Sequence, residues 1–309
     1  MKSVSIVMPT LNRPAPLRRA LDSLLAQTGL AGRTLEIIVA DNSADLSAQA
    51  TVAAIPTPAI PIRLVGVPAI GVANARNAGV AAAAGDWVAF LDDDEEAAPD
   101  WLSELLRVAE VAGADAAFGP VTARAESGEP MGDFTRFFER AYDFSDGSDV
   151  SGKASYLGAN NSMFDKVRCL SGPGPFDLRL NQSGGEDSYL LMQLALDGRR
   201  FAYAAKARVT EWVPPKRLNW PYVYRRRFLS GQIRVFVLTM VRPVRWLAIL
   251  KWTLVGLAQI PLAGLASMLL WTIGSPAHPK ALASFYSGLG KLFWLRRWRP
   301  KLYGEGHVS

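Results

Sequence analysis

Cysteine and histidine are scarce in this chain of 309 residues, and their scarcity excludes several kinds of site. Cys169 is the only cysteine, so no disulfide can form within the chain and the sequence does not require an oxidising compartment. Both histidines, His278 and His307, stand near the C-terminus. A metal bound in the first 277 residues would therefore have oxygen ligands, which favours a hard cation.

A long apolar stretch is missing from the N-terminus. The apolar run at residues 4–8 is about half the usual length for a secretory signal, and it leads into segment 9–13 instead of a small-residue cleavage site. We therefore expect a first strand that enters a loop. Half of all residues are hydrophobic and a fifth are charged, which excludes a disordered chain and leaves ample apolar area for a core.

Acidic residues are almost absent from the last third of the chain. Residues 1–198 carry 15 lysines and arginines against 26 aspartates and glutamates, whereas residues 199–309 carry 19 against two. The net charge of +6 is therefore the sum of an acidic N-terminal part and a strongly basic C-terminal part, which suggests that the two parts have different functions. Basic charge of this density indicates either nucleic acid or an anionic membrane surface as a partner.

The apolar run at residues 244–273 favours the membrane. As one helix it would span about 45 Å, against roughly 30 Å of hydrocarbon, and it lacks the polar face of a buried soluble helix. Basic patches for nucleic acid are not wrapped around thirty apolar residues, so we expect a membrane partner and no nucleic acid. The tryptophans expected to anchor this region at the interface are Trp246, Trp252, Trp271, Trp294 and Trp298.

Basic residues flank the apolar run on both sides, at Arg242 and Arg245 before it and within 291–301 after it. A single crossing would place one of these clusters on the wrong side of the membrane. Pro261 and Gly264 near the middle of the run instead predict a kinked hairpin or two paired short helices. This hairpin would enter and leave by the cytoplasmic face.

Short apolar segments alternate with helical patterns over the first 125 residues. This alternation is typical of an α/β fold with a mainly parallel sheet, in which ligands bind beyond the carboxyl ends of the strands. Polar residues at 10–12, 41–42 and 92–94 directly follow expected strands, so we expect them to meet at one edge of the sheet. The expected strands are 4–8, 35–40, 62–67, 87–91 and 114–121, and the expected helices are 14–27, 72–84, 100–112 and 186–197.

Five carboxylates stand in a row at residues 92–96, and they repel one another unless they are solvated or neutralised by a cation. An isolated acidic run is more often a solvated turn, but this one ends a buried strand at the ligand edge. Asp92 and Asp94 are two residues apart and in an extended segment would face the same way. This pattern favours a Mg²⁺ or Mn²⁺ site completed by substrate phosphates.

Three further features each have a structural and a functional interpretation. Asp41 is either a turn residue or an acceptor for a base or ribose. Arg76, the one cation in an alanine-rich helical pattern, is expected to pair with the acidic run or with a phosphate. The segment 184–187, Gly-Gly-Glu-Asp, either caps a helix or presents a general base to a metal-bound substrate.

Taken in order, these segments resemble the motifs of family 2 glycosyltransferases. The segments that carry the resemblance are 4–13, 41–43, 75–94 and 185–187, and the resemblance covers about residues 3–200. It implies a GT-A fold, in which an α/β domain binds a nucleotide sugar and a metal-coordinating Asp-x-Asp. It also implies direct displacement with inversion at the anomeric carbon.

The resemblance assigns roles residue by residue. Asp187, with Glu186 beside it, would be the catalytic base, and Asp41 would contact the nucleotide base, usually uracil. Asp92 and Asp94 would bind the nucleotide and, through Mg²⁺ or Mn²⁺, its diphosphate. The other residues expected to bind the nucleotide sugar are Pro9, Thr10, Asn12, Arg13, Arg76, Asn77 and Asp93.

The expected chemistry agrees with these roles. A departing sugar diphosphate gains negative charge, which a bound cation stabilises. The acceptor hydroxyl loses a proton as it attacks, so a carboxylate is needed on the opposite face. Acidic residues alone supply both roles, which fits a catalytic region without histidine.

Processive members of the family carry a Gln-x-x-Arg-Trp signature that is missing here. Gln232-Ile233-Arg234 has no tryptophan after its arginine, and 225–227 is Arg-Arg-Arg. We therefore expect one sugar to be added per encounter. The arginine cluster is either a clamp for the leaving diphosphate or, as we slightly favour, an anchor on the membrane surface.

The sequence thus predicts a GT-A catalytic domain at residues 1–219 and a basic, hydrophobic membrane-associated region at 220–309. The expected reaction moves a sugar, from a UDP-sugar by preference, to a lipid-linked or cell-envelope glycan at the cytoplasmic face of the membrane. A metal-dependent nucleotidyltransferase is one alternative, although segment 9–16 lacks the glycine-rich loop that it needs. A non-catalytic membrane scaffold that keeps the fold is the other.

Overall fold

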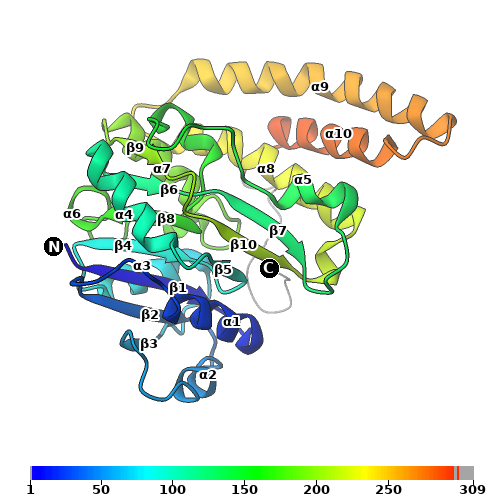
Figure 1. Ribbon diagram of the computed structural model, residues 1–309. Coiled ribbons are helices and arrows are strands. Elements are labelled where there is room, and N and C mark those ends of the chain that lie inside the picture. The colour runs from blue at the N-terminus through cyan, green and yellow to red at the C-terminus, as the bar shows by residue number, and fades with distance from the viewer. Residues whose placement is uncertain (1, 296–297, 299–309) are drawn as a thin grey trace.

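The computed structural model describes residues 2–295 and Trp298 (Figure 1). A seven-stranded sheet with the order β3-β2-β1-β4-β8-β6-β9 forms its centre. β8 runs antiparallel to both of its neighbours, and the other adjacent pairs are parallel, which confirms an α/β fold with a mainly parallel sheet. The strands are β1 (Val4–Thr10), β2 (Leu35–Asp41), β3 (Ile62–Gly66), β4 (Trp87–Leu91), β6 (Ala116–Phe118), β8 (Asn161–Asp165) and β9 (Phe201–Tyr203).

Helices cover both faces of this sheet. Alternate residues of β1 point to opposite faces, so Ile6 packs with α1 and α4 on one side while Val7 packs with α3 on the other. The second face is also covered by α7, whose Leu191 is fully buried. The helices before α8 are α1 (Pro14–Leu25), α2 (Gln49–Ala53), α3 (Val72–Ala82), α4 (Trp101–Ala112), α5 (Thr135–Phe138), α6 (Lys166–Cys169) and α7 (Glu186–Leu196).

A small second sheet has the order β5-β10-β7, and its first strand begins within the acidic run. The single strand expected at 114–121 is wrong, because the chain leaves the main sheet after Phe118 and enters the second one at Val121. Gly119 permits this exit, since a Cβ there would lie 2.1 Å from the carbonyl oxygen of Ala207. The elements involved are β5 (Glu95–Ala97), β7 (Val121–Ala125) and β10 (Val209–Val213), and short 3₁₀ turns lie at η1 (Gly132–Phe134), η2 (Ser151–Tyr156), η3 (Leu178–Leu180) and η4 (Pro215–Arg217).

Three helices follow the sheets: α8 (Trp220–Met240), α9 (Trp246–Thr272) and α10 (His278–Leu292). In Figure 1, α9 lies outermost, and α10 returns beneath it to pack against both α9 and α8. The hairpin reversal expected at Pro261–Gly264 is wrong, because α9 continues through the exposed Pro261. The chain reverses instead at Gly274, whose φ of +65° suits glycine. Most of the basic cluster expected at 291–301 lies outside the described residues.

Close glycine contacts fix α10 against α8. A Cβ on Gly290 would lie 2.0 Å from the carbonyl oxygen of Phe228, and one on Gly231 would lie 2.3 Å from that of Ser287. Any larger side chain at these positions would therefore push the two helices apart. Since α8 also contributes side chains to the cavity described below, this packing joins the C-terminal hairpin to that cavity.

Candidate active site

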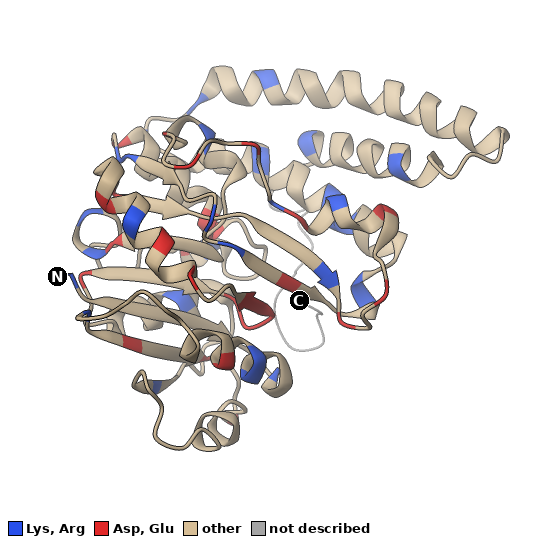
Figure 2. Cartoon of the chain, in the orientation of Figure 1, with Lys and Arg blue, Asp and Glu red and all other residues tan. Residues whose placement is uncertain are grey.

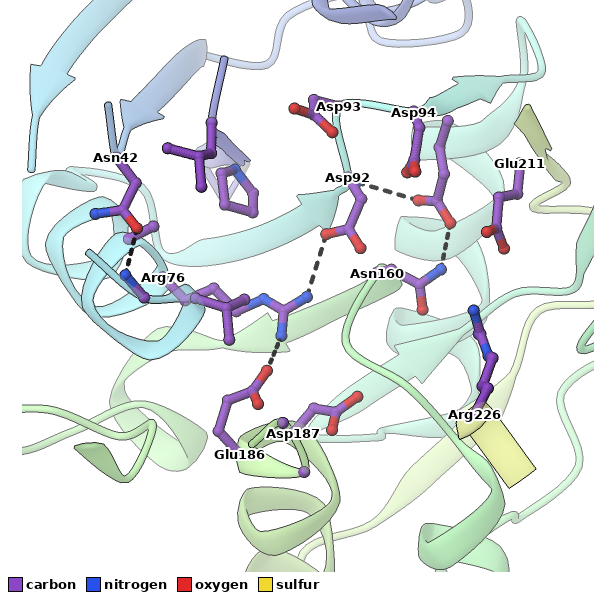
Figure 3. Close-up of a pocket in the computed structure, with 18 of the residues that line it drawn as sticks. Asn42, Arg76, Asp92, Asp93, Asp94, Asn160, Glu186, Asp187, Glu211 and Arg226 are labelled. Carbon is purple, nitrogen blue, oxygen red and sulfur yellow. Dashed lines mark hydrogen bonds and ion pairs between the residues drawn. The ribbon is translucent and has the colours of Figure 1, made fainter. Parts of the chain in front are cut away.

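A cavity of about 450 Å³ lies at the carboxyl ends of β1, β2 and β4 (Figure 3). Residues that follow these strands line it, as do the N-terminal ends of α3 and α7 and one side of α8. The predicted meeting of three strand ends at one edge is thus confirmed. The residues expected in the site that line this cavity are Pro9, Thr10, Arg13, Arg76, Asp92, Asp93, Asp94, Glu186 and Asp187.

The acidic run forms a turn at the floor of this cavity. The backbone N–H of Glu95 donates to the carbonyl oxygen of Asp92 at 3.1 Å, and the Glu95 carboxylate accepts from the N–H of Asp92. Asn160 donates to the other Glu95 oxygen, so this carboxylate is fixed from two sides. The expectation that Asp92 and Asp94 face the same way is wrong, because a turn replaces the extended segment that it assumed.

Asp93 and Asp94 are buried and each is paired. Thr10 Oγ1 donates to Asp93 at 2.7 Å, and Arg13 Nη1 lies 3.0 Å from Asp93 and 2.9 Å from Asp94. Arg217 Nη1 approaches Asp94 at 3.1 Å. Burial raises the pKa of Asp93 to about 6. Burial also acts to raise the pKa of Asp94, but the charges of Arg217 and Arg13 outweigh it and hold the pKa below its usual range.

Asp92 is the carboxylate of this turn that is most open to the cavity. Its side chain is 32% exposed, against 7% for Asp93 and 12% for Asp94. Among the described residues, no three Asp, Glu, His or Cys side chains form a ready metal site. Mg²⁺ and Mn²⁺ bound with substrate phosphates need only one or two carboxylates, a role that Asp92 fits. Asp94 would have to give up an arginine to join it.

Arg76 links the acidic turn to the start of α7. It is buried on α3, and its Nη2 lies 3.1 Å from Asp92 while its Nη1 pairs with Glu186 (Figure 3). The ring of Phe176 lies 5.7 Å from its guanidinium carbon. The expected pairing of Arg76 with the acidic run is therefore found, together with a second carboxylate that is 110 residues away in sequence.

Two glycines open α7, and the carboxylates that follow them lie in different environments. Gly185 has a φ of +92°, and a Cβ there would meet Ile233 of α8 at 2.8 Å. Glu186 is 2% exposed, and burial raises its pKa to about 7. Asp187 is half-buried, points into the cavity, and accepts from the N–H of Ser188 at 2.6 Å. Asp187 is therefore the one of the two that a substrate can reach.

Asp41 does not line the cavity. Its carboxylate is fully buried and accepts from the N–H of Ser43 at 2.9 Å and from the N–H of Ala48 at 2.7 Å. Direct contact with a nucleotide base would require it to give up such bonds. Its neighbour Asn42 does line the cavity, donates to the carbonyl oxygens of Val67 and Ala69, and accepts from the N–H of Gly71.

Asn77 and Asn12 also stand outside the lining residues. The Asn77 carboxamide pairs with both backbone groups of Phe176, at 2.8 and 2.9 Å, and so fixes the loop before α7. Asn12 is exposed with a φ of +55°, a conformation that asparagine tolerates, and it turns the chain from β1 toward α1.

Several lining residues come from parts of the chain that carried no motif. Arg140 and Asn160 lie in the connection before β8. Glu211 lies on β10, and Arg217 follows that strand, with its Nη1 3.6 Å from Glu211 Oε1. One signal was available for Glu211, which is one of two acidic residues after position 198. The contributions of α8 are Tyr222, Arg225, Arg226, Leu229, Ser230 and Ile233.

Comparisons with known sequences agree with this site. Residues 5–167 match the family model described as "Glycosyl transferase family 2". The succinoglycan biosynthesis protein ExoM of Rhizobium meliloti (strain 1021) is 34% identical over 232 residues, which cover 74% of this chain and 73% of ExoM. ExoO of the same strain is 39% identical over 115 residues, 37% of this chain and 32% of ExoO.

Solved structures show the same architecture. The mannosyltransferase PcManGT from Pyrobaculum calidifontis, in complex with GDP-Man and Mn²⁺, superposes with a TM-score of 0.62 at 17% identity, covering 95% of this chain and 87% of that one. S. aureus TarS 1–349 in complex with UDP gives 0.54 at 15% identity, covering 99% and 98%. The fold is therefore GT-A, with C-terminal helices. Since the family model matches over half of the chain and ExoM aligns along most of both proteins, the chain belongs to glycosyl transferase family 2.

Proposed function

We propose that this glycosyltransferase moves a sugar from a UDP-sugar to a lipid-linked glycan during exopolysaccharide assembly, at the cytoplasmic face of the membrane. The observation that carries the proposal is that Asp92 and Asp187, 95 residues apart in sequence, open into one cavity at the ligand edge of the sheet. The role of ExoM in succinoglycan biosynthesis supports the pathway, and the UDP bound to TarS supports the donor.

The donor would occupy the side of the cavity formed by β1, the loop held by Asn42, and the acidic turn. Pro9, Thr10 and Arg13 stand at the end of β1, where ligands of parallel sheets bind. Asp92, with Asp94 after a change of partner, would hold Mg²⁺ or Mn²⁺, which when bound stabilises the charge on the departing diphosphate. PcManGT was solved with Mn²⁺ in the same fold.

Asp187 would act as the general base. Its half-buried carboxylate faces the cavity, so it can accept the proton of an acceptor hydroxyl as that oxygen attacks the anomeric carbon. Glu186 is turned inward to Arg76 and supports the start of α7. Attack from the side opposite the diphosphate inverts the anomeric configuration.

Arg225 and Arg226 would bind the leaving diphosphate. Both line the cavity from α8, and guanidinium groups match phosphate oxygens in geometry and charge. This placement supports the clamp interpretation for these two residues. The remaining arginines of α8 face elsewhere.

Membrane contact would be made by α9. It is one helix of 27 residues that is long and apolar enough to cross a membrane by length and composition. Within its apolar 18-residue segment, 11% is buried. In Figure 2 it is tan along nearly its whole length. Its exposed apolar side chains include Leu247, Leu254, Leu262, Leu265, Met268 and Trp271.

We infer that α9 lies along the membrane surface. α10 packs against both α9 and α8, so a crossing α9 would draw α10 and the arginines of α8 into hydrocarbon, which is costly. A cysteine placed at Gly274 tests this, since burial raises the pKa of Cys169 to about 12 and keeps that native thiol unreactive. A membrane-impermeant maleimide added outside intact cells is expected to leave Gly274→Cys unlabelled, and labelling would show a crossing.

The reaction is tested with a panel of nucleotide sugars and Mn²⁺. We expect one UDP-sugar to be turned over and to protect the protein from thermal unfolding, and Asp187→Asn to keep the protection but lose the turnover. A chain that retained only the fold would show neither turnover nor an effect of Asp187→Asn. Preference for a GDP-sugar would overturn the UDP assignment alone.

A further inference from the structure

The helix α8 presents three surfaces along its length. Residues such as Arg226 and Ile233 line the cavity, while Gly231 contacts α10. Arg227 and Arg234 are seven residues apart, two helical turns, so they lie on one strip of α8. At 100° per residue this strip falls between the cavity side and the α10 side.

The guanidinium group of Arg234 lies between two aromatic rings, and one of its nitrogens has no hydrogen-bond partner among the described residues. Its guanidinium carbon lies 4.8 Å from the ring of Tyr156, on η2, and 4.8 Å from the ring of Trp252, on α9. The negative charge on the face of each ring attracts the guanidinium group without occupying its N–H groups. These groups therefore remain available to donate to an acceptor. Nη1 is buried and has no hydrogen-bond partner among the described residues. An oxygen acceptor would remove the cost of that buried donor.

Two more cations stand beside Arg234. Lys291 of α10 is 5% exposed, and its Cβ packs on Gly256, one turn of α9 beyond Trp252. Burial together with the charges of Arg227 and Arg234 lowers the pKa of Lys291 to about 8. Burial and the charges of Arg234, Arg136 and Arg226 likewise lower the pKa of Arg227.

No carboxylate compensates this group in the part of the chain that the structure describes. None of the described ion pairs includes Arg227, Arg234 or Lys291. Lys291 Nζ donates to neutral oxygens only, Gln259 Oε1 at 2.7 Å and Ser287 Oγ at 3.0 Å. Three partly desolvated cations without an acidic partner repel one another, and a bound anion relieves that repulsion.

We propose that Arg227, Arg234 and Lys291 form a binding site for a phosphate group carried on a lipid. Two guanidinium groups and one ammonium group match the charge and geometry of phosphate oxygens. The site lies against the inner side of α9, where Trp252 contacts Arg234, while Leu247 and Leu250 on the opposite side are 84% and 55% exposed. Insertion of that outer side into a bilayer would bring the site to the level of the lipid phosphates. A bilayer phospholipid and a lipid-linked acceptor share this chemistry. The inference rests on the proposed membrane contact of α9 and not on glycosyl transfer.

The test compares the full chain with Arg227→Gln/Arg234→Gln and with a control that also loses two positive charges, Lys206→Gln/Arg208→Gln. Lys206 and Arg208 are exposed in the connection between β9 and β10 and lie outside the site. Flotation would measure binding to vesicles of phosphatidylcholine alone, with added phosphatidylglycerol, and with added polyprenyl phosphate. Thermal unfolding in detergent, with and without inorganic phosphate, checks that each variant folds.

All three proteins are expected to bind neutral vesicles equally through α9. The gain in binding from a phosphate lipid is expected to fall about tenfold in the Arg227/Arg234 variant and less than threefold in the control. Loss confined to phosphatidylglycerol identifies a bilayer headgroup, and loss confined to polyprenyl phosphate identifies an acceptor lipid. Without phosphate, the site variant is expected to unfold at the same temperature as the parent or higher, because repulsion is relieved.

Equal losses in the site variant and the control would overturn the proposal, since they would show general attraction to anionic surfaces. An unchanged gain in the site variant would do so as well. Weak binding to neutral vesicles by all proteins would instead contradict the membrane contact of α9. UDP protection from unfolding is expected in every variant and reports separately on the donor site.

Discussion

At the cavity, the buried carboxylates of Asp93 and Asp94 lie within 3.1 Å of arginine nitrogens, whereas on α8 the guanidinium groups of Arg227 and Arg234 have no carboxylate partner among the described residues. The first arrangement neutralises its charges within the chain and fixes the loops that bear them. The second leaves charge for something outside the chain to neutralise. The charges on the proposed donor side of the cavity are therefore neutralised within the chain. The charges on the proposed membrane side are left for an external anion to neutralise.

The largest effect is expected from Asp187→Asn. This change keeps the size of the side chain but removes its ability to accept a proton, so kcat should fall by about 10²–10⁴-fold. The KM for the donor should stay within a factor of three, because Asp187 lies across the cavity from the acidic turn. Asp197→Asn, at the exposed end of the same helix, is the control, and an equal loss there would contradict the assignment.

Arg76→Gln tests the neutralised charges at the cavity. It leaves Asp92 and Glu186 without their shared cation, and removal of one member of a buried ion pair typically costs about 3–5 kcal/mol. Urea unfolding would measure the loss, and adding Glu186→Gln should recover part of it. Arg33→Gln breaks an exposed pair with Glu110 and should cost less than about 1 kcal/mol. Similar losses from both changes would show that the Arg76 network is not special.

Gly290→Ala tests the close packing of α10 against α8, which connects the C-terminal helices to the cavity. The added Cβ would lie 2.0 Å from the carbonyl oxygen of Phe228, so α10 must shift away from α8 at a cost of about 1–3 kcal/mol. Transfer should weaken as well, because α8 lines the cavity. Gly152→Ala adds the same methyl group where nothing lies within 4 Å, and its stability should stay within about 0.5 kcal/mol of the parent.

The pH dependence of stability gives the smallest change in any single step of one pH unit. Burial raises the pKa of Glu186 to about 7 from 4.5, so between these values the folded state binds more protons than the unfolded state. Stability should therefore fall as pH rises through this window, by up to about 1.4 kcal/mol per pH unit. Glu186→Gln should flatten that slope in urea titrations at pH 4.5 to 7. A slope unchanged in the variant would assign it to other groups.

The sequence predicted the strand ends and the position of the acidic run because these signals are local, whereas it did not predict the turn that the run forms. Apolar runs ending at Met8, Ala40 and Leu91 mark the strands, and parallel pairing then brings their ends together without further information. The pairing of Arg76 with the acidic run was predictable for a related reason, since an isolated cation on an alanine-rich helix needs a nearby anion.

Other features depend on contacts that no local pattern encodes. Glu211 and Arg217 reach the cavity through the second sheet, and that sheet forms only because the chain leaves the main sheet at Gly119. The continuity of α9 was missed because Pro261 was interpreted without the contacts around it. In the structure the proline is exposed on the outer side, while Gly264 lets α10 pack closely on the inner side.

One helix, α8, is both a wall of the cavity and the support on which α10 and α9 rest. With α9 on the membrane, as proposed, the thickness of these packed helices sets a constant height between the lipid surface and Asp187. A sugar carried at that height reaches the base, and one carried much nearer to or farther from the lipid does not. The C-terminal helices would thus act as a ruler that selects one position along a growing glycan.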